Sequence, residues 1–324
     1  RSGDRPADQE IGRTHRILIV RALNLSKTAL VLAACSLWAT CGTAQELSPR
    51  AYWPAPKGTK VAVFGYSYSF GDVATDPALP IFGVDSKINV GFFGYLQTLS
   101  LWGRTANVLV ELPYIWGTSK GIVEGVPRRR DVSGIGDIGV TLSVNLLGAP
   151  SMTPREFLEL RKSPRSILGA SVKVVGPTGE YEKDKLINVG ANRWAVKAEL
   201  GYVIPVRAKW LLELELGSWI FSDNDDFLGV TRGQRGVGAA EIHFVRRFNP
   251  GFWASLDFNY FWGGRSIVGG QLRQDSQRNS RLGGTVVVPF LGRHAIKFGY
   301  STGVFTYSGG DYETFLLSYQ VVFR

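Results

Sequence analysis

From residue 59 to the C-terminal end, the chain consists of segments in which apolar and polar side chains alternate at every second position. This period of two is the spacing of a β-strand whose two faces meet different surroundings. We identify twelve such segments, at 59–70, 86–99, 105–116, 135–147, 166–176, 192–204, 209–221, 236–247, 252–262, 279–290, 294–305 and 313–323. Most have roughly ten to thirteen residues, whereas strands of ordinary domains have about five or six. A strand of about ten residues is long enough to cross a bilayer at a tilt.

Long and short connections alternate between these segments. Loops rich in Gly, Asp, Pro and Arg, such as 117–134, follow most of the odd-numbered segments, and tight turns follow most of the even-numbered ones. Lipid offers no water to an unpaired strand edge, so a sheet that crosses a membrane must close on itself. We therefore predict an all-β fold, an antiparallel transmembrane β-barrel of about twelve strands, with its long loops outside the cell. A soluble β-sandwich is the alternative.

The connection after segment 135–147 is predicted to contain a short helix at 154–162. Thr153 is followed by Pro154 and, three residues on, by Glu156. A threonine with a glutamate three positions later forms a capping box, and proline is favoured at the first helical position. This helix would lie on the side of the tight turns, in the periplasm.

The chain ends in a strand with the sequence TFLLSYQVVFR, at 314–324. One face is wholly apolar and rich in aromatic residues: Phe315, Leu317, Tyr319, Val321 and Phe323. We interpret it as the closing strand of the barrel, with a lipid-facing stripe. Such an ending resembles the C-terminal signal that the outer-membrane assembly machinery recognises, although Arg324 follows the usual last aromatic residue.

The N-terminal part has the features of an exported protein. Arg21 and Lys27 precede an apolar run at 28–41, and small residues lead up to Ala44. This order is typical of a secretory signal peptide, here with cleavage after Ala44. A short buried helix and a lipoprotein cleavage box at Cys35 are the alternatives. The predicted parts are upstream sequence and signal peptide at 1–44, an N-terminal periplasmic segment at 45–58, and an outer-membrane barrel at 59–324.

The composition excludes several classes of protein. Both cysteines, Cys35 and Cys41, lie in the predicted signal peptide, so the exported chain would have no disulfide and must be held together by its core or by closed strands. Without residues 1–44 the chain has 31 basic and 24 acidic residues, a net charge of +7. We expect contact with outer-membrane lipid and lipopolysaccharide and with a small-molecule solute, and no nucleic-acid partner.

If the apolar face of each strand meets lipid, the polar face lines the lumen. The residues assigned to the lumen are Asn107, Glu111, Arg193, Lys197, Glu199, Glu213, Glu215, Glu241, His243, Asp257, Asn259, Arg281 and Lys297. Placing any of them against hydrocarbon would cost free energy. For a basic group at mid-bilayer the cost is about 2–4 kcal/mol. The turn positions place Lys197 opposite Glu215 and Glu241 near Asp257. Such a wall is either a structural charge ladder or a polar solute path, and both can hold together.

Two other groups of residues are candidate sites. Asp223, Asp225 and Asp226 are a weak candidate for calcium, because clustered carboxylates suit a hard cation. The run Arg128, Arg129 and Arg130 could contact lipopolysaccharide phosphates. No serine has a recognisable nucleophile setting. We therefore expect no catalytic residue, no enzyme activity, no cofactor and no other metal site.

Several stretches together resemble a known family. They are RAYWPAPKGT (50–59), ELPYIWG (111–117), SGIGDIGV (133–140), GPTGEY (176–181) and NVGANRW (188–194). They are similar to the outer-membrane proteins of the MetA-pathway phenol-degradation family, and the match would span 50–323. The resemblance implies a monomeric barrel that moves aromatic or other hydrophobic small molecules. The function expected is a channel for small organic solutes; an outer-membrane lipid hydrolase or a non-transporting structural barrel is the alternative.

Overall fold

The computed structural model describes residues 49–73, 81–123, 125–307 and 311–323. The predicted signal peptide and the terminal Arg324 lie outside these residues. Among the described residues, twelve strands form one closed antiparallel barrel, in agreement with the predicted fold class. The barrel strands are β1 (Lys60–Gly71), β2 (Ile81–Leu101), β3 (Arg104–Val123), β5 (Gly139–Leu147), β6 (Ile167–Val175), β7 (Ala195–Arg207), β8 (Trp210–Phe221), β11 (Val237–Arg247), β12 (Trp253–Gly263), β15 (Gln277–Phe290), β16 (His294–Phe305) and β17 (Tyr312–Phe323).

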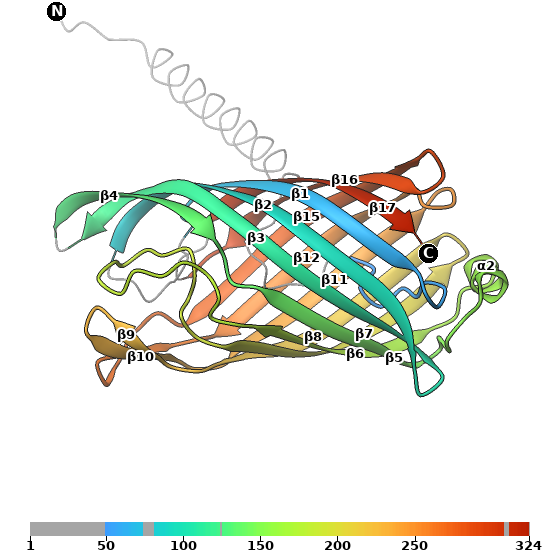
Figure 1. Cartoon of the computed structure of the whole chain (residues 1–324), viewed down its shortest axis with the longest axis horizontal. Coiled ribbons are helices and arrows are strands. Elements are labelled where there is room, and N and C mark those ends of the chain that lie inside the picture. Colours follow the sequence, from blue (N-terminus) through green and yellow to red (C-terminus); the bar gives the residue numbers. More distant parts are fainter. Residues whose placement is uncertain (1–48, 74–80, 124, 308–310, 324) are drawn as a thin grey trace, which may run out of the picture. The chain divides into compact units, whose positions relative to one another are not determined.

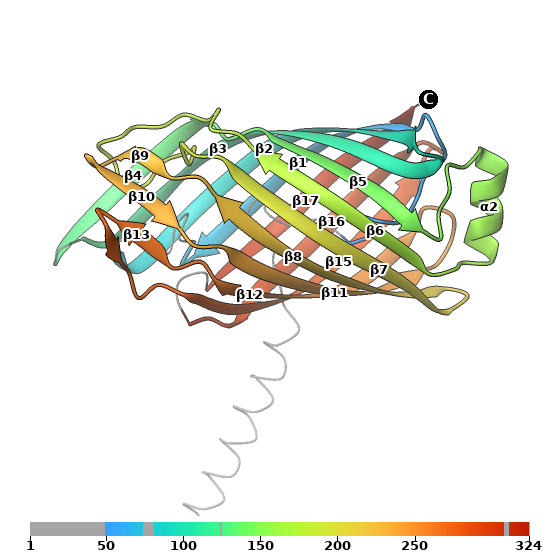
Figure 2. The same cartoon turned by 90° about the horizontal axis from the view of Figure 1, so that it is seen from below.

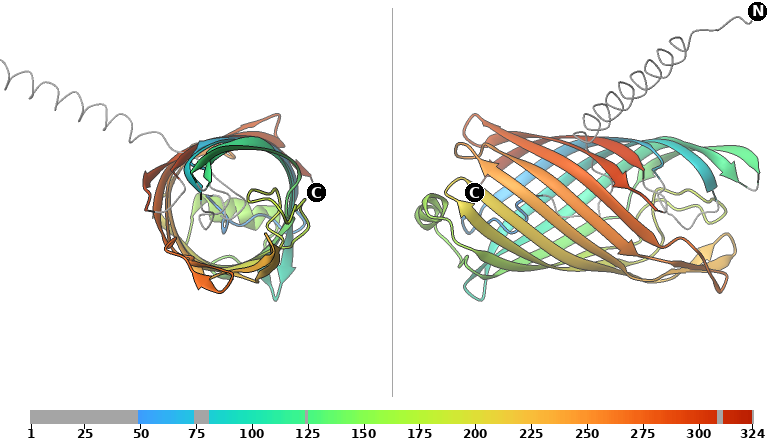
Figure 3. Two further views of the ribbon diagram at one scale, coloured as in Figure 1. Left: turned by 90° about the vertical axis from the view of Figure 1, so that its left-hand side faces the viewer. Right: turned by 180° about the vertical axis from the view of Figure 1, so that it is seen from behind.

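The barrel closes between its first and last strands. β1 pairs with β17 over its whole length, from Lys60 opposite Phe323 to Gly71 opposite Tyr312. β1 also pairs with β2, and β2 with β3, so the first strand has a neighbour on each side. Figure 3 shows the resulting ring of strands viewed along its axis. The prediction that TFLLSYQVVFR forms the closing strand is confirmed for the described residues up to Phe323.

The short helix α2 (Pro154–Lys162) has the predicted bounds. The Glu156 carboxylate accepts a hydrogen bond of 2.7 Å from the backbone N–H of Thr153, and the Thr153 side chain accepts from the N–H of Glu156. These contacts hold the pKa of Glu156 below its ordinary value. Figure 2 shows α2 at one end of the barrel. No helix among the described residues has the length and apolar character required of a membrane span.

The opposite end of the barrel carries structure that the alternation did not predict. β3 runs past the barrel and forms a hairpin with β4 (Val126–Ile135), in the stretch expected to be a loop (Figure 1). β5 accordingly begins at Gly139, four residues later than predicted. A second, four-stranded sheet contains β9 (Asn224–Phe227), β10 (Val230–Gln234), β13 (Ser266–Val268) and β14 (Gln271–Leu272). These short strands lack the long alternation by which the barrel strands were recognised.

The outer surface of the barrel is apolar and aromatic. Leu216 and Leu256 are more than half exposed in mid-strand positions, while the inward residues Glu215, Ser255 and Asp257 next to them are buried. A surface of this kind is the one that a lipid bilayer covers. Two tryptophans at strand ends, Trp219 and Trp253, are buried instead.

Cysteine labelling tests the orientation of the barrel. We expect a cysteine at Arg129, in the β4 hairpin, to react with an impermeant thiol reagent on intact cells. A cysteine at Asn249, in the tight turn between β11 and β12, should react only after the outer membrane is opened. Both native side chains are exposed, so a difference in labelling would report sidedness rather than burial. The reverse pattern would invert the topology.

Candidate functional site

The structure places the predicted lumen residues on the inward face of the barrel. Ten of them are at most 9% exposed: Arg193, Lys197, Glu199, Glu213, Glu215, Glu241, His243, Asp257, Arg281 and Lys297. Asn107, Glu111 and Asn259 are also inward but only partly buried. The period of two explains this placement, because every second residue of a strand shares one face.

Lys197 is the centre of a buried ion-pair cluster. Its Nζ lies 2.5 Å from Glu199 Oε2 on the same strand and 2.7 Å from Glu241 Oε1 on β11. β8 lies between these strands, and Lys197 reaches across it over Gly217, where a Cβ atom would lie 3.0 Å from Lys197 Cε. The glycine therefore leaves the room that this two-strand contact requires.

The pair of Lys197 and Glu215 predicted from the turns is wrong in register. Lys197 lies opposite Trp219 rather than Glu215, because β7 continues to Arg207 and its turn comes later than expected. Glu241 lies opposite Asn259, and Asp257 lies opposite His243. The same residues meet on the same wall, but with different partners.

Asp257 and His243 form a second contact of this wall. His243 Nδ1 lies 2.9 Å from Asp257 Oδ1, and the Thr285 hydroxyl donates to Asp257 Oδ2 at 3.0 Å. Farther round the barrel, Lys173 Nζ lies 2.6 Å from Glu111 Oε2. Lys173 was not among the predicted lumen residues, although the alternation of its segment would have assigned it inward.

The N-terminal segment, residues 49–59, lies inside the barrel against this wall. The Tyr52 hydroxyl is 3.0 Å from both Glu199 Oε1 and Ser171 Oγ. Its ring covers Gly169 and Gly201, where an added Cβ would lie 2.1 Å from the ring atoms. Two glycines on neighbouring strands thus form a seat for one aromatic side chain.

The same segment helps to fill the end of the barrel that carries α2. Tyr52 and Trp53 belong to an apolar cluster with Met152, Leu160 and residues from β6 through β15. The backbone N–H of Arg50 donates to Glu213 Oε2 at 2.6 Å, and Gly58 N–H donates to Thr98 O on β2. The segment therefore crosses the interior from one wall to the other near this mouth.

The opposite wall, formed by β1, β2, β3 and β17, carries apolar inward side chains between polar and glycine positions. We call it the apolar wall; its inward residues include Val61, Val63, Val90, Phe92, Leu96, Leu109, Ile115 and Leu316. All eight are partly exposed, unlike the buried charged wall. The contact of the Phe92 ring with Gly65, at 2.0 Å from an ideal Cβ, places Phe92 on the inward face.

The apolar wall shows that the more apolar face of a strand does not always meet lipid in this barrel. In 86–99 the face with Ile88, Val90 and Phe92 lies inward, whereas Phe93 faces outward and is 39% exposed. Both faces of this segment carry large apolar residues, so alternation alone could not assign them. Alternation therefore did not predict that apolar side chains line part of the lumen.

Three of the family-like stretches meet at Asp137, between β4 and β5. Its carboxylate accepts hydrogen bonds from the backbone N–H groups of Thr178, Gly179 and Ala191, at 2.8–3.0 Å. These bonds fasten the loop 176–194 to the barrel rim. The spacing of the motifs in the sequence gave no sign that they converge.

The other predicted sites have different surroundings. Arg129 pairs with Asp131 and Arg130 with Glu182, while Arg128 is exposed on β4. In the described part of the chain, no group of metal-ligand atoms forms from Asp223, Asp225 and Asp226. The Asp225 carboxylate instead accepts from Thr231, at 3.2 Å. The calcium expectation thus has no support in the geometry, and the lipopolysaccharide contact stays a prediction.

A closed antiparallel barrel with an aromatic, apolar exterior and a charged interior is an outer-membrane β-barrel protein. The family model described as "Putative MetA-pathway of phenol degradation" matches residues 58–318. The chain belongs to this family, as the resemblance of its motifs indicated.

A solved outer-membrane channel shares the fold, and other solved structures are less similar. The COG4313 outer membrane channel from Pseudomonas putida F1 matches with a TM-score of 0.71 and 24% identity, over 86% of this chain and 100% of that one. The β domain of the Bordetella autotransporter BrkA matches with a TM-score of 0.47 and 14% identity, over 82% and 100% of the two chains. The CymD monoaromatic hydrocarbon channel gives 0.44 and 9%, over 83% and 90%. No curated protein matches the sequence.

Proposed function

We propose that this barrel is an outer-membrane channel for small hydrophobic solutes, aromatic ones included. The observation that carries the proposal is the apolar wall of the lumen, with partly exposed side chains at Val90, Phe92 and Leu96. Apolar surface that faces the inside of a barrel, away from lipid, offers a favourable contact to a hydrophobic solute. The family name and the name of the channel from Pseudomonas putida agree with this function.

The charged wall would form the polar side of the same path. Its charged side chains are buried, and Lys197 is paired with both Glu199 and Glu241, which suits a rigid brace more than a set of mobile solute ligands. We therefore assign solute contact mainly to the apolar wall. The thirteen inward polar residues would stabilise the shape of the barrel and keep its lumen open.

Matched variants of two neighbouring phenylalanines test the proposed path. Phe92→Gln should lower uptake of a labelled monoaromatic solute by intact cells several-fold, because it puts an amide on the apolar wall. Phe92→Leu should retain most of the uptake, and Phe93→Leu, on the lipid-facing side, should leave it unchanged. The amount of folded barrel in the outer membrane would be measured for each variant. Equal uptake by all three variants would contradict a path along Phe92.

A further inference from the structure

Glu215, in the middle of the charged wall, has no partner for either carboxylate oxygen among the described residues. The residue is 4% exposed and lies directly opposite Glu241 on the neighbouring strand. Like charges that face each other across two strands repel. Lys197 offsets this repulsion at Glu215 only in part, because its ammonium group is in contact with Glu199 and Glu241. Burying a carboxylate without a hydrogen-bond donor costs free energy, so a bound ligand at this position would be stabilising.

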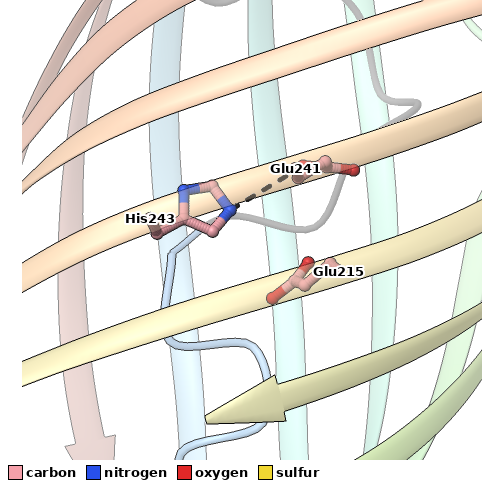
Figure 4. Close-up of side chains that lie close together, drawn as sticks. All are labelled: Glu215, Glu241 and His243. Atoms are coloured by element: carbon pink, nitrogen blue, oxygen red, sulfur yellow. Dashed lines mark ion pairs between the residues drawn. The ribbon is translucent and has the colours of Figure 1, made fainter. Parts of the chain in front are cut away.

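His243 presents a second unused atom to the same place. It is 2% exposed, its Nε2 has no hydrogen-bond partner among the described residues, and this atom lies 3.8 Å from Glu241 Oε2. Figure 4 shows the imidazole of His243 turned toward Glu241, with Glu215 on the next strand. Ligand atoms of the three residues all lie within 4.8 Å of one another. The cluster thus offers one nitrogen and two carboxylates around a common point.

The surroundings orient these groups as they are oriented in metal sites. An imidazole that donates from Nδ1 to the Asp257 carboxylate, 2.9 Å away, has an Nε2 lone pair available for coordination. In many metal sites, the histidine that binds the metal through one nitrogen donates a hydrogen bond to a carboxylate from the other. Lys197 and Asn259 donate to Glu241, at 2.7 Å and 3.3 Å, which fixes its carboxylate.

The charge balance of the wall also favours a cation. Five carboxylates are buried together: Glu199, Glu213, Glu215, Glu241 and Asp257. The cations next to them are Lys197 and, beside Glu213, Arg50. With the five carboxylates, Lys197 and Arg50 charged and His243 neutral, five negative charges face two positive ones, an excess of three. Buried charge of one sign is expensive unless it is paired or coordinates a metal.

We propose that Glu215, Glu241 and His243 bind a divalent transition-metal ion, with zinc as the best fit, that ties β8 to β11 inside the barrel. Imidazole together with carboxylates suits Zn²⁺, whereas Ca²⁺ prefers oxygen ligands alone. Ligands about 2.1 Å from zinc in a tetrahedral arrangement lie about 3.4 Å apart, so small side-chain rotations would bring the three groups to the ion. The site is independent of the channel function.

Zinc binding by the purified barrel tests this proposal. The protein would carry an affinity tag without histidine, be stripped with a chelator, and be titrated with Zn²⁺ or Ca²⁺. We expect one zinc per barrel and a rise in the temperature at which the folded band is lost on a gel, with no rise in Ca²⁺. Glu215→Gln and His243→Gln should each abolish both effects. Glu111→Gln, which removes an inward carboxylate of another cluster, should retain them.

Two results would overturn the proposal. One is a wild-type barrel that binds no zinc above the level of His243→Gln and whose heat resistance does not respond to chelator or to Zn²⁺. The other is a Glu215→Gln variant that is at least as heat resistant as the zinc-treated wild type, since Glu215 would then be held as a neutral acid. The wild-type measurement stands alone if a variant fails to fold.

Discussion

The double substitution Tyr52→Ala, Trp53→Ala should raise the conductance of the barrel in planar bilayers several-fold. Both side chains lie in the N-terminal segment that crosses the interior near the α2 end, and both are buried, at 1% and 7% exposed. Removing a buried aromatic side chain typically costs about 3–5 kcal/mol. Loss of two such contacts should release the segment from its seat on Gly169 and Gly201 and widen the mouth.

Trp102→Ala is the matched control for that experiment. Trp102 is an aromatic residue at the same end of the barrel, in the turn between β2 and β3, but it is 85% exposed. Its removal should leave the conductance unchanged. If the double variant also conducts like the wild type while its segment has become sensitive to protease, the segment does not limit the path.

Lys197→Met should produce the largest loss of stability of any single substitution in the charged wall. Lys197 is 2% exposed and is the ammonium group in contact with both Glu199 and Glu241. Removing one partner of a buried ion pair leaves uncompensated charge and typically costs about 3–5 kcal/mol. The free energy of unfolding, measured by denaturant titration of the folded barrel in detergent, should fall by about that amount.

Two further variants separate this effect from a general loss of charge. Lys162→Met removes an exposed lysine of α2 that pairs with Glu159, and it should change the stability little. Adding Glu199→Gln to Lys197→Met should recover part of the loss, because one orphaned carboxylate is then gone. A Lys197→Met barrel as stable as the wild type would show that the carboxylates are not charged around it.

The strands of the barrel could be predicted because lipid imposes a strict pattern. A strand with lipid on one face and a polar interior on the other must alternate along its length, so the ends of β6, β8 and β17 were within a residue or two of the prediction. The helix α2 was predicted from Thr153, Pro154 and Glu156, since capping depends on residues next to one another in sequence. Such local rules are readable without a structure.

The partners within the site could not be predicted, because they depend on register and tilt. Alternation assigns Lys197 and Glu241 to one face, but their contact crosses an intervening strand over Gly217. An error of a few residues in a turn exchanges every cross-strand partner, as it did for Glu215. The seat of Tyr52 was missed for a similar reason, since its two glycines lie more than a hundred residues away.

Solute uptake by cells tests the channel function most directly. Gram-negative cells that lack their own aromatic channels would produce the wild-type barrel, the Phe92→Gln variant or no barrel, and the initial rate of entry of a labelled monoaromatic solute would be compared. We expect the wild-type barrel to raise this rate well above that of cells without it, and Phe92→Gln to remove most of the gain. Equal rates in all three, with the barrel folded in the outer membrane, would contradict the channel.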